Sequence, residues 1–420
     1  MKWIALLDCN NFFVSCERLF RPDLAKQPVV VLSSNDGCVV ARSQEVKDMG
    51  IPMGVPHFNV KDEFKRAGVV VFSSNFTLYR DISARVMRTL REEVEHMSQY
   101  SVDEAFFTLE IDEADLKNKG SRAVGELQRI KAVMEQKVGV PVSIGVARTK
   151  TLAKVANHMA KKGPGVLVLT DEIWQEASHN MIIGELWGVG RGLSERFTKA
   201  GITTPRELMQ ADPARISQVF GVVGSRLQNE LLGRQATTLD RTLELQHSIM
   251  STRSFGDATN DLTAIERALA HHIEHAVAEL RDMGGVASTL RILVQPSRFS
   301  DFAFQGIGHE VTLDAPSDDT RVFLSAGIRA LRDLHRPGVP YKKAGAVLSG
   351  ITDKRTATNS LFAPTLDSSL MSVIDTINQR FGPDGVTFFG GNKRNTLTKS
   401  AHHSGQPTTR WQAIPSVKAN

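Results

Sequence analysis

Short apolar runs alternate with amphipathic segments over the first 170 residues of the chain. The runs have the length and the β-branched or aromatic content of buried strands, and they lie at residues 3–8, 28–33, 69–73, 98–109, 141–147 and 165–169. Between the fourth and fifth runs, residues 122–138 carry apolar side chains at helical spacing. This alternation of strands and helices predicts an α/β or α+β domain.

The pattern changes twice after residue 170. Residues 171–235 read as short helices separated by glycine-containing turns, and the polar stretch 234–247 reads as a linker. A second unit of helices and strands follows. Its helices are expected at 264–283 and 321–334, and its strands at 288–295, 309–313 and 344–351. The chain beyond is rich in Ser, Thr, Gly and Pro, so we expect little regular structure there.

Two acidic segments interrupt these apolar runs. The run at residues 3–7 ends on Asp8, and Asp103 and Glu104 stand together between apolar, β-prone residues. A carboxylate at a strand end is most often a cap or a solvated turn, and that explanation stays open. Both flanks, however, read as buried strands, where clustered carboxylates repel one another unless cations neutralise them. Hard oxygen ligands suit Mg²⁺, so the pattern also predicts two-metal phosphoryl transfer.

The composition is that of an ordinary globular protein with more than one domain. A chain of 420 residues with 41% hydrophobic and 23% charged residues has ample core material, and such a length predicts roughly two to four domains. Its three cysteines, Cys9, Cys16 and Cys38, have no zinc-like spacing and fit a reducing cytosol. The opening apolar run is too short for a signal peptide, and no apolar stretch approaches the roughly 20 residues of a membrane span. We therefore expect a cytoplasmic protein without membrane contact.

Charge is unevenly distributed along the chain. The net charge is +5, and residues 351–420 hold eight basic against four acidic residues. Such a tail suits nucleic acid or an acidic partner, although a solvated chain end explains it as well. Residues 248–350 hold 11 basic and 12 acidic residues, so any grip on DNA there must depend on where the charges lie. Charge alone does not establish a nucleic-acid enzyme.

A glycine motif has both a functional and an ordinary explanation. Gly188 and Gly190 form a Gly-x-Gly turn before an apolar-periodic helix, which resembles a helix-hairpin-helix. Such a turn leaves backbone N–H groups free for a phosphate, but most Gly-x-Gly turns are only turns. The segment Gly-Val-Val-Gly at 221–224 offers the same device again.

Two helical motifs carry metal- or phosphate-binding residue types. Lys150, Lys154 and Lys161 fall near one face of a basic helix. A solvated face is the common explanation, and a cationic wall for a triphosphate is the alternative. Residues 271–275 (His-His-Ile-Glu-His) match an inverted zinc-protease motif. We reject a zinc site there, because the segment belongs to a regular amphipathic helix and no convincing acidic ligand follows.

With the carboxylates, the lysine helix and the glycine turn in this order, the chain resembles the Y-family DNA polymerases, above all their UmuC subfamily. The similar blocks span nearly the whole chain and lie at 8–17, 20–24, 28–42, 73–79, 100–106, 149–154 and 253–256. The resemblance implies an α+β, right-hand polymerase. Its parts would be the palm (1–20 and 76–170), fingers (21–75), helical thumb with a helix-hairpin-helix (171–234), linker (235–247), little finger (248–351) and basic tail (352–420).

The resemblance also implies where the reaction takes place. Asp8, Asp103 and Glu104 would be the catalytic carboxylates and would hold two Mg²⁺ ions. The carbonyl of Cys9 would be a further ligand. One ion would activate the primer 3′-hydroxyl, and the other would bind the triphosphate and support the departing pyrophosphate.

Four further residues are implied in nucleotide binding. Phe13 matches the steric-gate position, where a flat ring leaves no room for a 2′-hydroxyl, and Phe12 beside it is the better candidate for the core. Lys161 aligns with the triphosphate-binding lysine of the family. Lys47 stands where many relatives have Arg, so the charge is kept but the bidentate geometry is lost.

The resemblance further implies macromolecular partners. Primer-template DNA would contact Gly188 and Gly190 in the thumb, and residues on one face of the little finger, for example Arg253, Arg291 and Arg298. Leu361 and Phe362 match the end of a sliding-clamp peptide, although Thr358 stands in place of its usual Gln. A processed UmuD-type dimer and a RecA filament complete the expected partners, and the active protein would be associated with the nucleoid.

The implied activity is error-prone translesion DNA synthesis from dNTPs, as part of SOS mutagenesis. Two alternatives come from other classes. A palm-fold nucleotidyl cyclase would carry glycines before its acidic pair, and this chain has Val102 there. A non-catalytic DNA-binding regulator would not need all three carboxylates.

Overall fold

The computed structural model describes residues 2–118, 120–237, 245–297, 304–356, 369–381, 385–388, 400–408 and 410–414. The chain divides into two compact units. The first comprises Met1–Val31, Cys38–Thr242 and His403–Asn420, and the second comprises Leu32–Gly37 and Leu243–His402. Both units contain helices as well as β-sheet, which confirms the predicted α+β class.

The first unit contains a five-stranded sheet with the order β5-β6-β1-β7-β8, called the palm sheet because it lies where the sequence predicts the palm. Its strands are β1 (Lys2–Cys9), β5 (Ser98–Gln99), β6 (Glu104–Glu110), β7 (Val142–Ala147) and β8 (Val166–Val168). Only the pair β7 and β8 is parallel. The strand expected at 98–109 is interrupted at residues 100–103, where the chain bends. The main helices around the sheet are α4 (Phe76–Glu93), α6 (Ser121–Val138) and α7 (Lys150–Lys161), and a short α5 (Glu113–Lys117) precedes α6.

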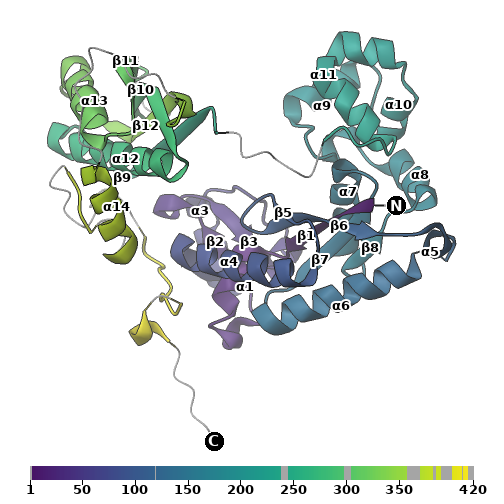
Figure 1. Cartoon of the computed structure of the whole chain (residues 1–420). Helices are drawn as coiled ribbons and strands as arrows, with labels where there is room; N and C mark the ends of the chain where they lie inside the picture. Colours follow the sequence, from purple (N-terminus) through teal and green to yellow (C-terminus); the bar gives the residue numbers. More distant parts are fainter. Residues whose placement is uncertain are drawn as a thin grey trace, which may run out of the picture. The chain divides into compact units, whose positions relative to one another are not determined.

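Alternate residues of β1 face opposite sides of the palm sheet, and each side has its own apolar core. Trp3 and Leu7 belong to the core that includes residues of α4 and α6. Ile4 and Leu6 belong to the core that includes residues of α7. Figure 1 shows α6 and α7 on opposite sides of the sheet. Asp8 has the same parity as Ile4 and Leu6, so it faces α7.

Helix α7 is held close against the sheet. A Cβ atom added at Gly145 on β7 would lie 2.0 Å from the backbone nitrogen of Asn157, so no side chain fits there. The Asn157 side-chain amide donates to the carbonyls of Leu6 (3.1 Å) and Ser143 (2.8 Å). The glycine and the asparagine together fix α7 over the strands.

A smaller sheet, β3-β2-β4, follows α1 (Phe12–Arg18) in the chain. Its strands are β2 (Val29–Leu32), β3 (Val39–Arg42) and β4 (Val70–Ser73), and the helices α2 (Gln44–Asp48) and α3 (His57–Ala67) connect β3 to β4. The apolar pattern predicts β2 and β4 but not β3. Strand β3 has only four residues and ends on an arginine, so it gives no clear apolar run.

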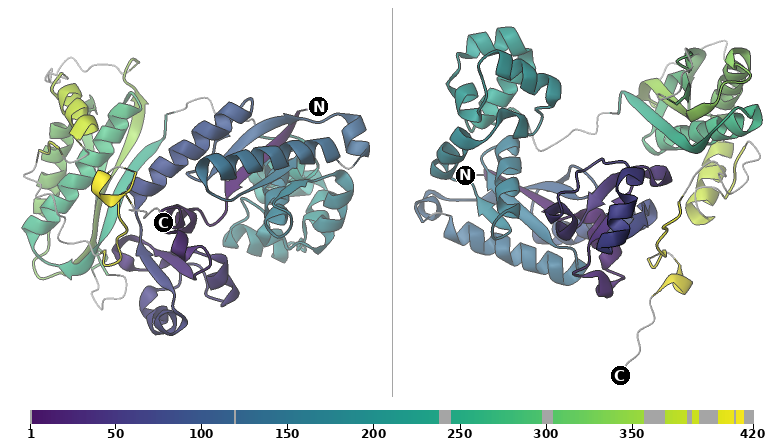
Figure 2. Two further views of the ribbon diagram at one scale, coloured as in Figure 1. Left: turned by 90° about the horizontal axis from the view of Figure 1, so that it is seen from below. Right: turned by 180° about the vertical axis from the view of Figure 1, so that it is seen from behind.

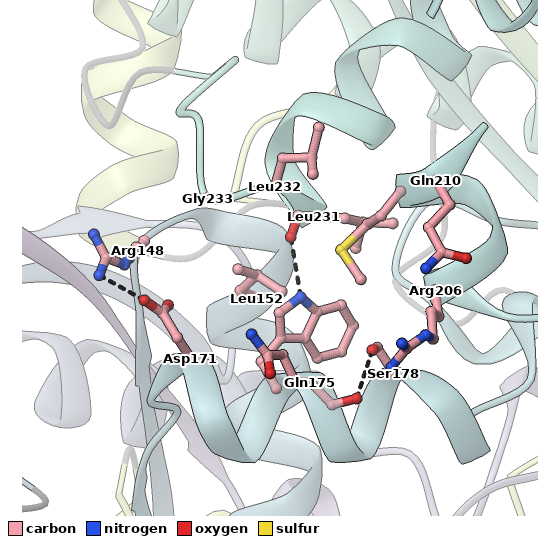
Figure 3. A pocket seen from close by; sticks show the side chains of 12 residues that line it. Arg148, Leu152, Asp171, Gln175, Ser178, Arg206, Gln210, Leu231, Leu232 and Gly233 are labelled. Atoms are coloured by element: carbon pink, nitrogen blue, oxygen red, sulfur yellow. Dashed lines mark hydrogen bonds and ion pairs between the residues drawn. The ribbon is translucent and has the colours of Figure 1, made fainter. Parts of the chain in front are cut away.

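The short helices expected after residue 170 are α8 (Asp171–Asn180), α9 (Arg191–Lys199), α10 (Pro205–Gln210) and α11 (Pro213–Leu231). Trp174 on α8 donates from Nε1 to the carbonyl of Leu231 at 3.0 Å. Beside this bond lies a pocket of about 620 Å³, with Arg148 and Asp171 paired at one end (Figure 3). None of the predicted catalytic carboxylates lines this pocket.

The second unit contains a four-stranded antiparallel sheet with the order β11-β10-β12-β9, called the little-finger sheet because it lies where the sequence predicts the little finger. Its strands are β9 (Ser248–Thr259), β10 (Gly285–Pro296), β11 (Ile307–Ser317) and β12 (Tyr341–Asp353), and its helices are α12 (Leu262–Asp282) and α13 (Thr320–Leu334). Both helices pack on one face of the sheet (Figure 2). The apolar pattern predicts every element except β9, in which Ser, Thr and Arg outnumber the buried Ile249 and Phe255.

The expectation of little regular structure beyond the second unit's sheet is wrong for one segment. Helix α14 (Ser369–Phe381) forms there because Met371 and Ile374 are buried. Arg281 makes a bidentate contact with Asp375 on α14 at 2.6 and 2.7 Å. Among the helices of the described residues, none is long and apolar enough to span a membrane.

Candidate active site

The centre of the site is a pair of carboxylates on neighbouring strands. Asp8 on β1 lies directly opposite Glu104 on β6, so both side chains project from the α7 side of the palm sheet. Burial raises the pKa of Asp8 to about 7, the Lys161 charge opposes this rise, and Glu104 adds to it. Burial also acts to raise the pKa of Glu104, but hydrogen bonds with Lys154 and Asp8 lower it overall. A nearby cation is therefore needed to keep both carboxylates of the pair ionised.

Two lysines of α7 neutralise this pair. Lys161 Nζ lies 2.7 Å from Asp8 Oδ1, and Lys154 Nζ lies 2.6 Å from Glu104 Oε1. Lys154 is also held over the rings of Tyr100 (4.7 Å) and Trp187 (5.6 Å). The lysine spacing in the sequence signals this shared face, although the resemblance assigns a role only to Lys161. Lys154 lies in the similar block at 149–154, but the resemblance gives it no role in the site.

Asp103 lies next to Glu104 but makes different contacts. Its Oδ1 accepts a hydrogen bond from Ser101 Oγ at 2.6 Å, and its carbonyl accepts from the N–H of Cys9 at 2.9 Å. Within the described part of the chain, no three His, Cys, Asp or Glu side chains converge in a metal-binding arrangement. The structure thus brings two of the three predicted carboxylates together and leaves the third beside them on the turn.

The donor set fits a hard divalent cation. Carboxylate oxygens are the ligands that Mg²⁺ prefers, and the buried Asp8, with its raised pKa, beside the partly buried Glu104 is stabilised by such an ion. The Cys9 thiol is unsuited to this task, because burial raises its pKa well above the usual range. Of the groups of Cys9, the carbonyl is the hard oxygen ligand.

An aromatic cluster begins immediately after the β1 turn. Asn11 adopts a left-handed conformation (φ 49°), which asparagine tolerates, and α1 starts behind it. Phe12 is buried in the core, whereas the half-buried Phe13 ring stacks on Tyr79 with ring centroids 4.4 Å apart. The Tyr79 hydroxyl donates to Glu17 at 2.7 Å. Tyr79 and Glu17 are not predicted as site residues, although both lie in blocks that resemble the family.

Lys47 on α2 shares the electrostatic environment of the carboxylate pair. Partial burial lowers its pKa, the positive charges of Lys161 and Arg42 lower it further, and Asp8 opposes them. The charges of Lys47 and Lys161 therefore act on each other, and both act on Asp8.

The Gly188 and Gly190 turn directly precedes helix α9, where the sequence predicts it. Gly188 has a φ of 85°, which favours glycine, and Gly190 is the N-cap of α9. Gly221 interrupts α11 with a φ of 63° and a ψ of −157°.

The expectation that Arg253 and Arg291 share one face of the little finger is wrong. Arg253 pairs with the buried Ala344, whereas Arg291 pairs with Val347, three residues further along β12. Successive residues of a strand point to opposite faces, so Arg253 lies on the helix-covered face and Arg291 on the open face. Arg298, Leu361 and Phe362 lie outside the described residues.

The side chains of the His-His-Ile-Glu-His segment point to different partners. His272 is buried, and its Nδ1 lies 2.9 Å from Ser251 Oγ. Glu274 accepts a hydrogen bond from the backbone of Phe388 at 3.1 Å. His271 and His275 are exposed, with ring centroids 6.5 Å apart.

The fold has known counterparts. A Y-family DNA polymerase chimera of Dbh and Dpo4 matches with a TM-score of 0.64 over 84% of this chain and 99% of the other, at 19% identity. The insertion ternary complex of Dbh DNA polymerase matches with a TM-score of 0.54 at 18% identity, over 83% of this chain and 98% of the other. The fold is that of a right-hand polymerase.

Sequence comparisons identify the family. The impB/mucB/samB family matches residues 7–158, its C-terminal domain matches 246–361, and a domain of unknown function (DUF4113) matches 368–417. Protein UmuC of Salmonella typhimurium is 37% identical over 99% of this chain and all of its own. Protein ImpB of that species is 35% identical over 98% of both chains. DNA polymerase IV of Corynebacterium diphtheriae is 27% identical over 87% of this chain and 78% of its own.

The chain belongs to the impB/mucB/samB family and is a UmuC-like Y-family polymerase. It is a DNA-directed, translesion DNA polymerase, as predicted from the sequence. The cyclase and regulator alternatives are not favoured, because the similarity runs through the whole chain rather than the palm alone.

Proposed function

We propose that Asp8, Asp103 and Glu104 are the catalytic carboxylates and hold two Mg²⁺ ions, with the Cys9 carbonyl as a further ligand. Y-family polymerases depend on divalent metal ions, and the cross-strand pair of Asp8 and Glu104 is the observation that supports this site most directly. When bound, the ions supply activation of the primer hydroxyl and stabilisation of charge on the phosphates.

The residues around the pair suit a nucleoside triphosphate. The primer 3′-oxygen forms a bond to the α-phosphorus, and pyrophosphate leaves with the electrons of the broken bond. Lys161, Lys154 and Lys47 bind the negative charge of the triphosphate as point charges. Phe13 packs against the deoxyribose beside Phe12, so that a 2′-hydroxyl has no room.

DNA contacts are proposed in both units. The backbone N–H groups at the start of α9, where the N-cap Gly190 provides no capping side chain, bind a phosphate, as in a helix-hairpin-helix. In the second unit the open face of the sheet carries Arg291 and Lys343, together with the hydroxyls of Thr252 and Thr289. Cations and hydroxyls are suitable groups for a phosphate backbone. Arg253 lies on the other face and is no longer proposed for this role.

The partners and boundaries remain proposals supported by the full-length similarity to UmuC. We infer binding of a processed UmuD-type dimer, a RecA filament and a sliding clamp, the last through Leu361 and Phe362. We also infer a cytoplasmic protein that joins the nucleoid when active. The palm, fingers, thumb, linker, little finger and tail keep the boundaries expected from the sequence.

Primer extension tests the proposed site. Wild type and Asp103→Ala are compared with Mg²⁺ and dNTPs on undamaged and abasic templates, first with a clamp and then with activated partner proteins. We expect extension by the wild type alone, equal DNA affinity of both proteins, and no extension without Mg²⁺. Normal extension by Asp103→Ala would remove Asp103 from the site.

A further inference from the structure

A segment near the C-terminus packs on the first unit beside the aromatic cluster. Residues 403–408 and 410–414 belong to this unit, although helix α14 before them belongs to the second. The segment folds back on itself, since the N–H of Arg410 donates to the carbonyl of Gln406 at 2.8 Å. It lies within the match to the domain of unknown function.

Two hydrogen bonds from one amide fasten this segment to α4. Asn75 is the buried N-cap of α4, and its Oδ1 accepts from the N–H of Leu78. Its Nδ2 donates to Ser404 Oγ and to the carbonyl of Gly405, each at 2.9 Å. The segment is therefore joined to a side chain whose own position the helix fixes.

A third hydrogen bond connects the segment to Glu17, beside the aromatic cluster. The Ser404 hydroxyl donates to Glu17 Oε1 at 3.1 Å, and the Tyr79 hydroxyl donates to the same oxygen at 2.7 Å. Glu17 is 3% exposed and Tyr79 is 1% exposed, so water does not compete for these bonds. Tyr79 in turn stacks on Phe13, with their planes 14° apart.

A continuous series of contacts thus runs from the C-terminal segment to the sugar-selecting ring. Asn75 orients the Ser404 hydroxyl, Ser404 and Tyr79 meet on one oxygen of Glu17, and the Tyr79 ring sets the plane of Phe13. The ring of a steric gate must resist displacement by an extra hydroxyl, so its support matters as much as its presence.

We propose that Ser404 is a positioning residue for sugar selection and acts through Glu17 and Tyr79 on Phe13. This inference rests on the proposed role of Phe13. It gives the C-terminal domain of unknown function a task in nucleotide selection. Ser404 contacts Glu17, which supports Tyr79 and through it the Phe13 ring. It does not contact the catalytic carboxylates or the reacting atoms.

The kinetic test compares incorporation of a dNTP and the matching rNTP by the full-length chain. The variants are Ser404→Ala, Ser404→Thr and Phe13→Ala, with Gln412→Ala as an exposed control in the same segment. We expect Ser404→Ala to raise the rNTP to dNTP ratio of kcat/KM about fivefold, the effect of roughly one hydrogen bond. Ser404→Thr, which keeps the hydroxyl, and Gln412→Ala should both show the wild-type ratio. Phe13→Ala should show the highest ratio of all the variants.

A spectroscopic test does not depend on activity. The chain has three tyrosines, so ¹⁹F NMR of 3-fluorotyrosine protein gives three resonances, and Tyr79→Phe assigns one of them. The chemical shift of the Tyr79 resonance should differ from the wild-type value in Ser404→Ala. It should equal the wild-type value in Ser404→Thr and Gln412→Ala.

The outcomes separate the two ideas. Unchanged sugar selectivity in Phe13→Ala would overturn the proposed gate itself. A working gate, with an unmoved Tyr79 resonance and unchanged selectivity in Ser404→Ala, would overturn the positioning role alone. Equal losses for dNTP and rNTP in Ser404→Ala, together with a lower melting temperature, would show that Ser404 only stabilises the fold.

Discussion

The palm sheet and the little-finger sheet are both packed against helices, yet they place their polar residues differently. In the palm, β1 is buried from Trp3 to Cys9, and its polar residue Asp8 is matched by Glu104 and Lys161. In the little finger, the strands are buried on one face and carry exposed side chains on the other, such as Arg291 on β10 opposite Glu310 on β11.

The two sheets should therefore respond differently to substitution. Buried charges in the palm depend on one another, so removal of one leaves its partner uncompensated. Exposed charges of the little finger act in parallel through screened interactions, so each contributes little. We therefore expect single substitutions to be severe in the palm and mild, but additive, in the little finger.

The largest effect should follow a change in the carboxylate pair. Glu104→Gln keeps the shape of the side chain but removes its charge, so we expect kcat to fall on the order of a thousandfold. Single-turnover incorporation measures this loss. DNA affinity and melting temperature should stay near those of the wild type, and a loss of less than tenfold would contradict the central role of the pair.

A smaller effect is expected for the lysine that pairs with Glu104. Lys154→Met keeps the aliphatic stem between Tyr100 and Trp187 but removes the charge, so we expect kcat/KM for dNTP to fall roughly tenfold to a hundredfold. Lys162→Met, on the exposed end of the same helix, is the matched control. Equal behaviour of both variants would mean that Lys154 has no part in nucleotide binding.

His272 in the second unit is an exception to the expected mild effects, because it is buried and contacts Ser251. Burial lowers the pKa of His272 to about 3, helped by the charges of His271, His275 and Arg253. The folded state therefore binds the proton less well than the unfolded state. Its stability is complete above the unfolded pKa of roughly 6.5 and declines as the pH falls toward the folded value.

Hydrogen exchange of α12 amides can measure this decline. Between pH 7.5 and 5.0, protection corrected for intrinsic rates should fall by about 2 kcal/mol. In His272→Gln this pH dependence should disappear, while amides of the palm sheet give the baseline. Unchanged protection of wild-type α12 at pH 5.0 would contradict the assignment.

The smallest effect should come from the open face of the little finger. Arg291→Ala should weaken binding of primer-template DNA about twofold to fivefold and reduce the salt slope by about one. Arg253→Ala is the control, because that side chain lies on the helix-covered face. A larger loss for Arg253→Ala than for Arg291→Ala would reverse the assignment of faces.

Local patterns in the sequence predict most elements, because apolar periodicity reflects burial directly. They also place Asp8 and Glu104 at strand ends and Lys154 and Lys161 on one helix face. Strand β9 is missed since its polar residues obscure the alternation, and this error puts Arg253 on the wrong face. Its parity with the buried Ile249 and Phe255 would have corrected it.

Other features depend on contacts that no local pattern contains. Glu17 and Ser404 are 387 residues apart in the chain, and Asn75 and Ser404 are 329 apart. The direction of the Asp103 side chain is set by Ser101, two residues away, rather than by its place beside Glu104. A family resemblance identifies such residues, but only packing shows which of them touch.

The close approach of α7 to β7 has a consequence for how the chain tolerates variation. Gly145 contributes no side chain to the site, yet even a methyl group there would push α7 away and shift Lys154 and Lys161 from their carboxylates. In a saturation scan scored by activity, this position should tolerate as few replacements as Asp8 itself. An inactive variant at Gly145 would report a displaced helix, with every chemical group of the active site still present.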